Sequence, residues 1–68
     1  MGTRTRTIEF FEVGRVERRG INGSVKIERG YSRRADGGER PWRTAAEARR
    51  EASTIGFRAV LIPRGGAR

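Results

Sequence analysis

The stretch of residues 39–64, "ERPWRTAAEARREASTIGFRAVLIPR", begins like a capped helix and ends like a β-strand. Thr44 with Glu47 three residues later is the pattern of a capping box, in which each side chain bonds the other residue's backbone N–H. Gly56 is the residue type that ends a helix in a left-handed conformation. We therefore predict a helix over residues 45–55, followed directly by a strand over residues 57–62.

The predicted helix carries alanine where a helix that faces a core usually carries leucine. At about 100° per residue, the alanine positions and Ile55 fall on one narrow stripe of the helix. These positions are Ala45, Ala48, Ala52 and Ile55. Small side chains let a helix axis lie close to a sheet, so the sheet must supply the bulk of the core. The expected suppliers are Phe10 or Phe11, Ile27, Trp42 and Leu61.

Residues 7–17 are rich in β-forming residue types, but their apolar pattern is irregular. Ile8 and Phe10 fall on one face of an extended strand, whereas Phe11 and Val13 fall on the other. Either both faces of this strand are covered, or a β-bulge shifts its phase before the next apolar residue.

Residues 24–31 alternate more regularly, and "RRGINGS" connects the two strands. A two-residue turn at Asn22 and Gly23 would set like charges opposite each other. We therefore predict a four-residue loop, 20–23, because the resulting register pairs opposite charges. Its cross-strand pairs are Glu17 with Lys26, Arg15 with Glu28, and Val16 with Ile27.

A second turn is expected at "ADGGE", where residues 36–38 supply a permissive backbone. Residues 31–34 and 39–42 could pair across it, which would add a short third strand. The predicted order is β-β-(β)-α-β: an α+β fold with a small antiparallel sheet of three or four strands on one helix. We expect a disordered N-terminus over 1–6, one domain over 7–63, and a flexible glycine- and arginine-rich tail over 64–68.

Composition excludes several classes of function. The 68 residues contain neither cysteine nor histidine, so a disulfide, a zinc or haem site and the usual general base are not expected. We find no nucleophile–base pair, phosphate loop or calcium-loop spacing, and we predict a protein that is not an enzyme and uses no cofactor or metal. No apolar run is long enough to cross a membrane, and we expect a cytoplasmic protein.

The formal net charge is +8, from 16 basic and 8 acidic residues. Lys26 is the only lysine, so nearly all of the positive charge is arginine. A charge this large on a small domain favours an anionic partner, most often nucleic acid. A solvated basic surface with another role is the alternative.

The arginines near the two predicted turns are the candidate nucleic-acid-binding residues, because guanidinium groups bind phosphate in a bidentate manner. They are Arg18, Arg19, Arg33, Arg34, Arg40 and Arg43. Tyr31 and Trp42 lie among them in "GYSRR" and "RPWR" and could stack on unpaired bases. Both aromatic residues could instead fill the core, and the arginines beside glycine-rich turns could simply be solvated.

From Val13 to about Ile55, and above all in "RPWRTAAEARREA", the sequence resembles the arm-type DNA-binding domains of phage integrases. In that family an aromatic residue, a Thr/Ser cap and a Glu-Ala pair follow the last strand before the helix, as Trp42, Thr44 and Glu47-Ala48 do here. The resemblance implies a three-stranded sheet that reads DNA in the major groove, and a phage or mobile-element source. The predicted strand over 57–62 departs from the family pattern.

These observations lead to two functional predictions. The first is a small nucleic-acid-binding domain, with DNA slightly preferred over RNA, that makes arginine–phosphate contacts from its hairpin loops. The alternative is a protein-interaction module, for example a homodimer, because Phe10 and Phe11 point to opposite faces of one strand. Arginines that converge on one surface would favour the first prediction.

Overall fold

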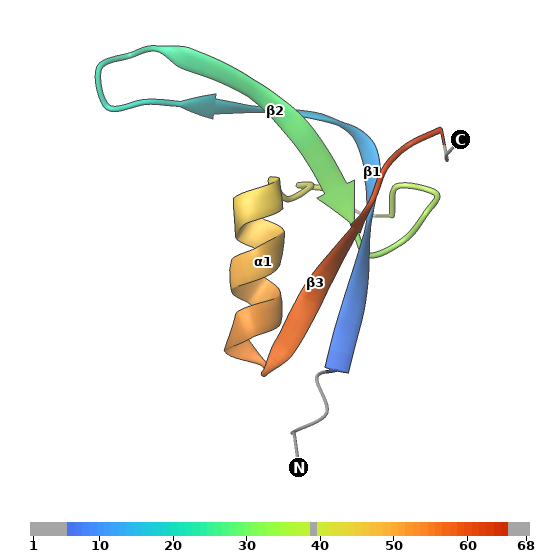
Figure 1. The fold of residues 1–68 in the computed structure, drawn as a ribbon. Coiled ribbons are helices and arrows are strands. Elements are labelled where there is room, and N and C mark those ends of the chain that lie inside the picture. The colour runs from blue at the N-terminus through green and yellow to red at the C-terminus, as the bar shows by residue number, and fades with distance from the viewer. Residues whose placement is uncertain (1–5, 39, 66–68) are drawn as a thin grey trace.

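A computed structural model describes residues 6–38 and 40–65 of the chain. It contains the strands β1 (Arg6–Arg19) and β2 (Val25–Ser32), the helix α1 (Ala45–Thr54) and the strand β3 (Phe57–Ile62) (Figure 1). Arg6 belongs to β1 and not to a disordered segment. The rest of the predicted N-terminal segment, and residues 66–68 of the predicted tail, lie outside the described residues.

The predicted α+β class is confirmed, with one helix on a three-stranded sheet of order β2-β1-β3. The sheet is mixed, which corrects the expectation of an antiparallel sheet. β2 pairs with β1 in the antiparallel sense, whereas β3 pairs with β1 in parallel, from Arg6 opposite Phe57 to Phe11 opposite Ile62. The cause is the short connection after α1, which sends β3 back along the helix and beside the free edge of β1.

The predicted capping box is present at the start of α1. The Thr44 hydroxyl accepts a hydrogen bond from the Glu47 backbone N–H, and the Glu47 carboxylate accepts one from the Thr44 backbone N–H. Gly56 has φ 77°, as expected of a helix stop. The helix ends one residue earlier than predicted, and Ile55 caps it with its side chain 55% exposed. Ile55 is therefore not part of the buried stripe.

The core is one layer between α1 and the sheet. Phe10 is fully buried and packs with Ile8, Tyr31, Ala48 and Ala52. Partly buried Ala45, Phe57, Ala59 and Leu61 surround this cluster. The alanines of the predicted stripe and the expected partners Phe10 and Leu61 are thus confirmed in the core, whereas Trp42, also expected there, packs on the hairpin instead. Ile27 was expected in the core but is 57% exposed, because it pairs with Glu17 on the face of the hairpin opposite to the one from which Arg18 reaches α1.

The alternation in β3 explains its continuous apolar sequence. Ala59 and Leu61 pair with Ile8 and Phe10 and face the helix. Val60 and Ile62 pair with Glu9 and Phe11 on the opposite face of the sheet. No described helix or strand covers that face, and the outer edge of β3 has no described neighbour. One apolar run therefore serves both the core and an uncovered surface.

The β1–β2 hairpin contains a bulge, which was one of the two alternatives for this strand, but it does not have the predicted register. The register shifts between Glu12 and Gly14. Beyond the bulge, Arg18 lies opposite Lys26, Glu17 opposite Ile27, and Arg15 opposite Arg29. The loop is one residue longer than predicted because Ser24 belongs to it. The Gly20 N–H donates to the Ser24 carbonyl at 2.7 Å, and the Ser24 N–H donates to the Asn22 side chain at 3.1 Å.

The predicted third strand over 39–42 does not form, and Glu39 itself lies outside the described residues. A single antiparallel bridge joins Tyr31 to Arg43, with N–H···O distances of 2.7 and 2.9 Å. The intervening turn is closed instead by the Trp42 indole N–H, which donates to the Gly37 carbonyl at 2.9 Å. Pairing is limited to one residue pair because Thr44 already begins the helix cap.

Trp42 packs on two glycines that lie opposite each other in the hairpin, Gly14 and Gly30. A Cβ atom at Gly14 would lie 2.3 Å from the Trp42 ring, and one at Gly30 would lie 3.2 Å from it. The ring therefore occupies the space that side chains would fill at these two positions. This contact fixes the turn between β2 and α1 against the hairpin.

We predict that Gly14→Ala destabilises the protein on the order of 1–3 kcal/mol, because the new methyl group overlaps the Trp42 ring. For a domain of this size that corresponds to a Tm lower by at least about 5 °C, measured by circular dichroism. Gly30→Ala should lower the free energy of unfolding by less, since a methyl group at Gly30 would make tight contacts but would not overlap the ring. In a protein that already carries Trp42→Phe, Gly14→Ala should lower the free energy of unfolding by less than it does in the wild type. An equal loss of stability in both proteins would contradict the assigned contact.

Candidate nucleic-acid interface

Four of the six predicted arginines line one surface hollow of about 380 Å³. They are Arg33, Arg34, Arg40 and Arg43. Ser32, at the end of β2, and Pro41, before the helix, complete much of its wall. We call this the arginine hollow. The turn between β2 and α1 brings its arginines together, since the Tyr31–Arg43 bridge joins the two ends of that turn.

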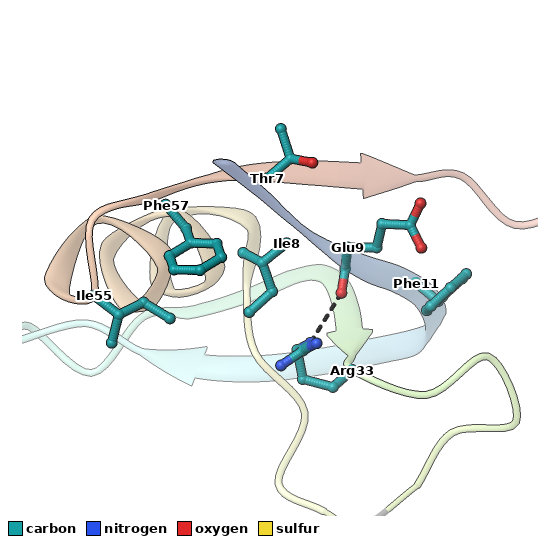
Figure 2. A pocket seen from close by; sticks show the side chains of 7 residues that line it. All are labelled: Thr7, Ile8, Glu9, Phe11, Arg33, Ile55 and Phe57. Carbon is teal, nitrogen blue, oxygen red and sulfur yellow. Dashed lines mark hydrogen bonds between the residues drawn. The ribbon is translucent and has the colours of Figure 1, made fainter. Parts of the chain in front are cut away.

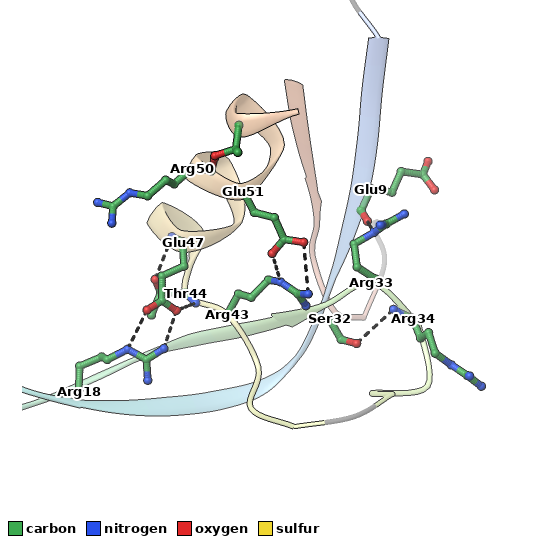
Figure 3. A network of polar contacts seen from close by, with 11 residues as sticks. Glu9, Arg18, Ser32, Arg33, Arg34, Arg43, Thr44, Glu47, Arg50 and Glu51 are labelled. Atoms are coloured by element: carbon green, nitrogen blue, oxygen red, sulfur yellow. Dashed lines mark hydrogen bonds and ion pairs between the residues drawn. The ribbon is translucent and has the colours of Figure 1, made fainter. Parts of the chain in front are cut away.

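Two of these arginines form ion pairs within the turn and the helix. Arg34 and Asp36 pair at 2.8 Å, and both side chains are exposed. The pKa of Asp36 is lowered, chiefly by the hydrogen bond from Arg34 and also by one from the Gly38 backbone. Arg43 makes a two-pronged contact with the Glu51 carboxylate on α1 (Figure 3). These carboxylates neutralise two of the four positive charges in the hollow.

Neutral groups hold the other two arginines in position. The Arg33 Nε donates to the Glu9 backbone carbonyl at 3.0 Å (Figure 3), and its guanidinium carbon lies 5.6 Å from the centre of the Phe10 ring. The Arg40 guanidinium carbon lies 4.5 Å from the centre of the Trp42 ring. Among the described residues, no carboxylate lies within ion-pair distance of either. Within the described part of the chain, Arg33 and Arg40 are thus positioned without having their charge neutralised.

Arg18 lies outside the arginine hollow and makes a bidentate ion pair with Glu47 (Figure 3). This contact holds the hairpin against the first turn of α1, over which the hairpin curves (Figure 1). Arg50 lies three residues after Glu47 on the helix, but the described partner of Glu47 is Arg18. Arg19 is exposed at the end of β1 and lines none of the three hollows described here.

A second hollow of about 300 Å³, the hairpin hollow, lies between β1 and the turn before α1. Arg15, Arg18 and Trp42 line it, together with Arg40 and Pro41, which also line the arginine hollow. Arg15 is not among the six arginines predicted to bind nucleic acid. Arg15 lies on the same strand as Arg18 and soon after the bulge. This placement is the sequence feature from which Arg15 could have been predicted.

The two candidate stacking residues have mainly structural contacts. Tyr31 is only 5% exposed and belongs to the core, so its ring has no face available to a base. Trp42 is half-buried, with Gly14 and Gly30 against its ring and Arg40 close to it. Its remaining exposed edge lines the hairpin hollow.

Within the described residues, no group of three or more histidine, cysteine, aspartate or glutamate side chains is arranged to hold a metal ion. None of the described helices is both long enough and apolar enough to span a bilayer. No protein-family model, curated protein or solved structure matches the chain significantly.

The Arg18–Glu47 contact predicts a specific loss of stability in acid. The hydrogen bond from Arg18, followed by that from the Thr44 backbone, lowers the pKa of Glu47 below its ordinary value of 4.5. A carboxylate whose pKa is lower in the folded state contributes stability above its unfolded pKa, and this contribution is lost as pH falls through the folded value. Glu47→Gln keeps a capping-box side chain but removes the charge.

We expect Glu47→Gln to have a lower Tm than the wild type at pH 7. The difference between the two proteins should shrink as the pH falls below about 4.5, measured by thermal unfolding from pH 7 to pH 3. Glu17→Gln serves as the control, since Glu17 is exposed and has no ion pair among the described residues. A difference that stays constant over this pH range would contradict the assigned role of the Arg18–Glu47 pair.

Proposed function

We propose that this domain binds nucleic acid at the arginine hollow, with DNA as the first candidate substrate. The observation that carries the proposal is the convergence of Arg33, Arg34, Arg40 and Arg43 around one hollow. Guanidinium groups that are held in place but not neutralised are suited to bind phosphate oxygens, because little side-chain entropy is then lost on binding. Arg33 and Arg40 meet this description best.

The distribution of charge over the domain supports the same assignment. Where β3 pairs with β1, the uncovered face of the sheet carries Arg58 and Glu9 as its charged residues, so this part of the sheet has no excess of positive charge. The turn and hairpin, by contrast, carry the clustered arginines. We therefore assign the phosphate contacts to the loops and not to the flat sheet face. Membership of the arm-type integrase class, and a phage or mobile-element source, remain part of the proposal and rest on the sequence resemblance.

We predict that Arg33→Gln/Arg40→Gln weakens DNA binding about tenfold or more at physiological salt. If both arginines contact phosphates, the slope of log K against log salt for duplex DNA should fall by about 0.9 for each one removed. Fluorescence anisotropy with a labelled oligonucleotide, titrated at several salt concentrations, measures both quantities.

The matched control is Arg49→Gln/Arg50→Gln, which removes the same charge from exposed positions on α1. This variant should keep most of the affinity and most of the salt slope. If the two double variants lose affinity equally, binding depends on overall charge and the assignment to the arginine hollow is wrong. Circular dichroism should first establish that both variants are folded.

A second candidate function is self-association through β3. Phe11, Val60 and Ile62 lie on the uncovered face of the sheet, and Val60 is 37% exposed. The outer edge of β3 is unpaired among the described strands, and Arg58 is its only charged residue. An edge strand of this kind can pair with a second copy of the chain. Sedimentation equilibrium tests this candidate, and a monomer over a wide concentration range would exclude it.

A further inference from the structure

A third hollow, of about 380 Å³, shares Arg33 with the arginine hollow; Figure 2 shows the residues that line it. Four of its seven lining residues are apolar and three are polar, and they come from β1, from the end of α1 through the start of β3, and from Arg33 after β2. We call it the apolar hollow, and its apolar residues are Ile8, Phe11, Ile55 and Phe57. Arg33 and Glu9 form its polar border, joined by the hydrogen bond from Arg33 to the Glu9 carbonyl.

The three hollows are joined by the two arginines that lack a described carboxylate partner. Arg33 lines both the apolar hollow and the arginine hollow, and Arg40 lines both the arginine hollow and the hairpin hollow. The surface therefore presents, in order, an apolar site, a cationic site and a site with an aromatic edge and further arginines. A positive charge stands at each of the two junctions.

This order matches the chemistry of a nucleic-acid strand whose bases are unpaired. Such a strand alternates an anionic backbone with flat apolar bases, and proteins bind it by combining cationic contacts with apolar or aromatic contacts to the bases. Each hollow has a volume near the lower end of the range of about 300–1,000 Å³ that holds small ligands. A base can enter a space of that size only when it is not paired in a duplex.

We infer that the ligand of this surface is a single-stranded nucleic acid, with one base in the apolar hollow and with backbone phosphates at Arg33 and Arg40. The inference rests on the proposed function, because it requires the same two arginines to bind phosphate. It goes further by assigning a base-contact site on the far side of Arg33. In this arrangement Phe57 and Ile55 contact the base, and Arg33 contacts the adjoining phosphate.

The decisive comparison uses three labelled probes of equal length at the same salt concentration. They are a single-stranded oligothymidylate, the same backbone with every base removed, and a DNA duplex. We expect the oligothymidylate to bind about tenfold more tightly than the abasic strand, a modest value for one base contact. It should also bind more tightly than the duplex. An RNA strand of the same length shows whether the sugar matters.

Variants of the apolar hollow provide the second arm of the test. Ile55→Ser alters a side chain that is 55% exposed, so the fold should tolerate it, and it should reduce binding of the oligothymidylate several-fold without changing that of the abasic strand. Ile27→Ser is the matched control, because Ile27 is 57% exposed but lies outside the three hollows. It should leave both affinities unchanged.

The possible outcomes separate this inference from the proposed function. If the normal and abasic strands bind with equal affinity, and Arg33→Gln/Arg40→Gln lowers that affinity, the base site is wrong. The phosphate contacts would then still stand. Tighter binding of the duplex than of the single strand would likewise overturn the inference alone. Absence of binding to all probes at physiological salt would overturn both.

Discussion

The packing of Trp42 on Gly14 and Gly30 is the contact on which the candidate interface depends. It fills the space above two glycines of the hairpin, and its indole N–H closes the turn through the Gly37 carbonyl. The turn that carries the arginines is thereby held against the hairpin, and Arg40 is held close to the same ring. Without this contact the turn would be joined to the sheet chiefly by the Tyr31–Arg43 bridge and by the hydrogen bond from Arg33 to the Glu9 carbonyl.

The helix and its packing could be predicted from the sequence because their signals are local. Thr44, Glu47 and Gly56 set its two ends, and the alanine stripe indicated close packing on a bulky sheet. The parallel pairing of β3 with β1 could not be predicted, since it joins residues about fifty positions apart. The hairpin register was missed by one residue because the side chain of Asn22 lengthens the loop. The bulge was recognised as an alternative from the broken apolar alternation.

The sequence predicted which arginines belong to the candidate site. It did not predict which of them form ion pairs with carboxylates. Residue type and proximity to turns identified all four arginines of the hollow. Which of them keep their charge available depends on tertiary contacts, such as Arg43 with Glu51, or Arg18 with Glu47 at a separation of 29 residues. Tyr31 was ambiguous for the same reason, because only the packed fold shows that its ring is enclosed. Arginines therefore have two roles here: some bind the elements together, and others remain available to a ligand.

The most direct test of the central claim is an NMR titration that follows the arginine side-chain Nε–Hε resonances as a single-stranded oligonucleotide is added. The account predicts that the signals of Arg33 and Arg40 shift most, that the Trp42 indole signal shifts with them, and that those of Arg49 and Arg50 stay in place. Shifts spread evenly over all arginines, or confined to the backbone of β3, would contradict it.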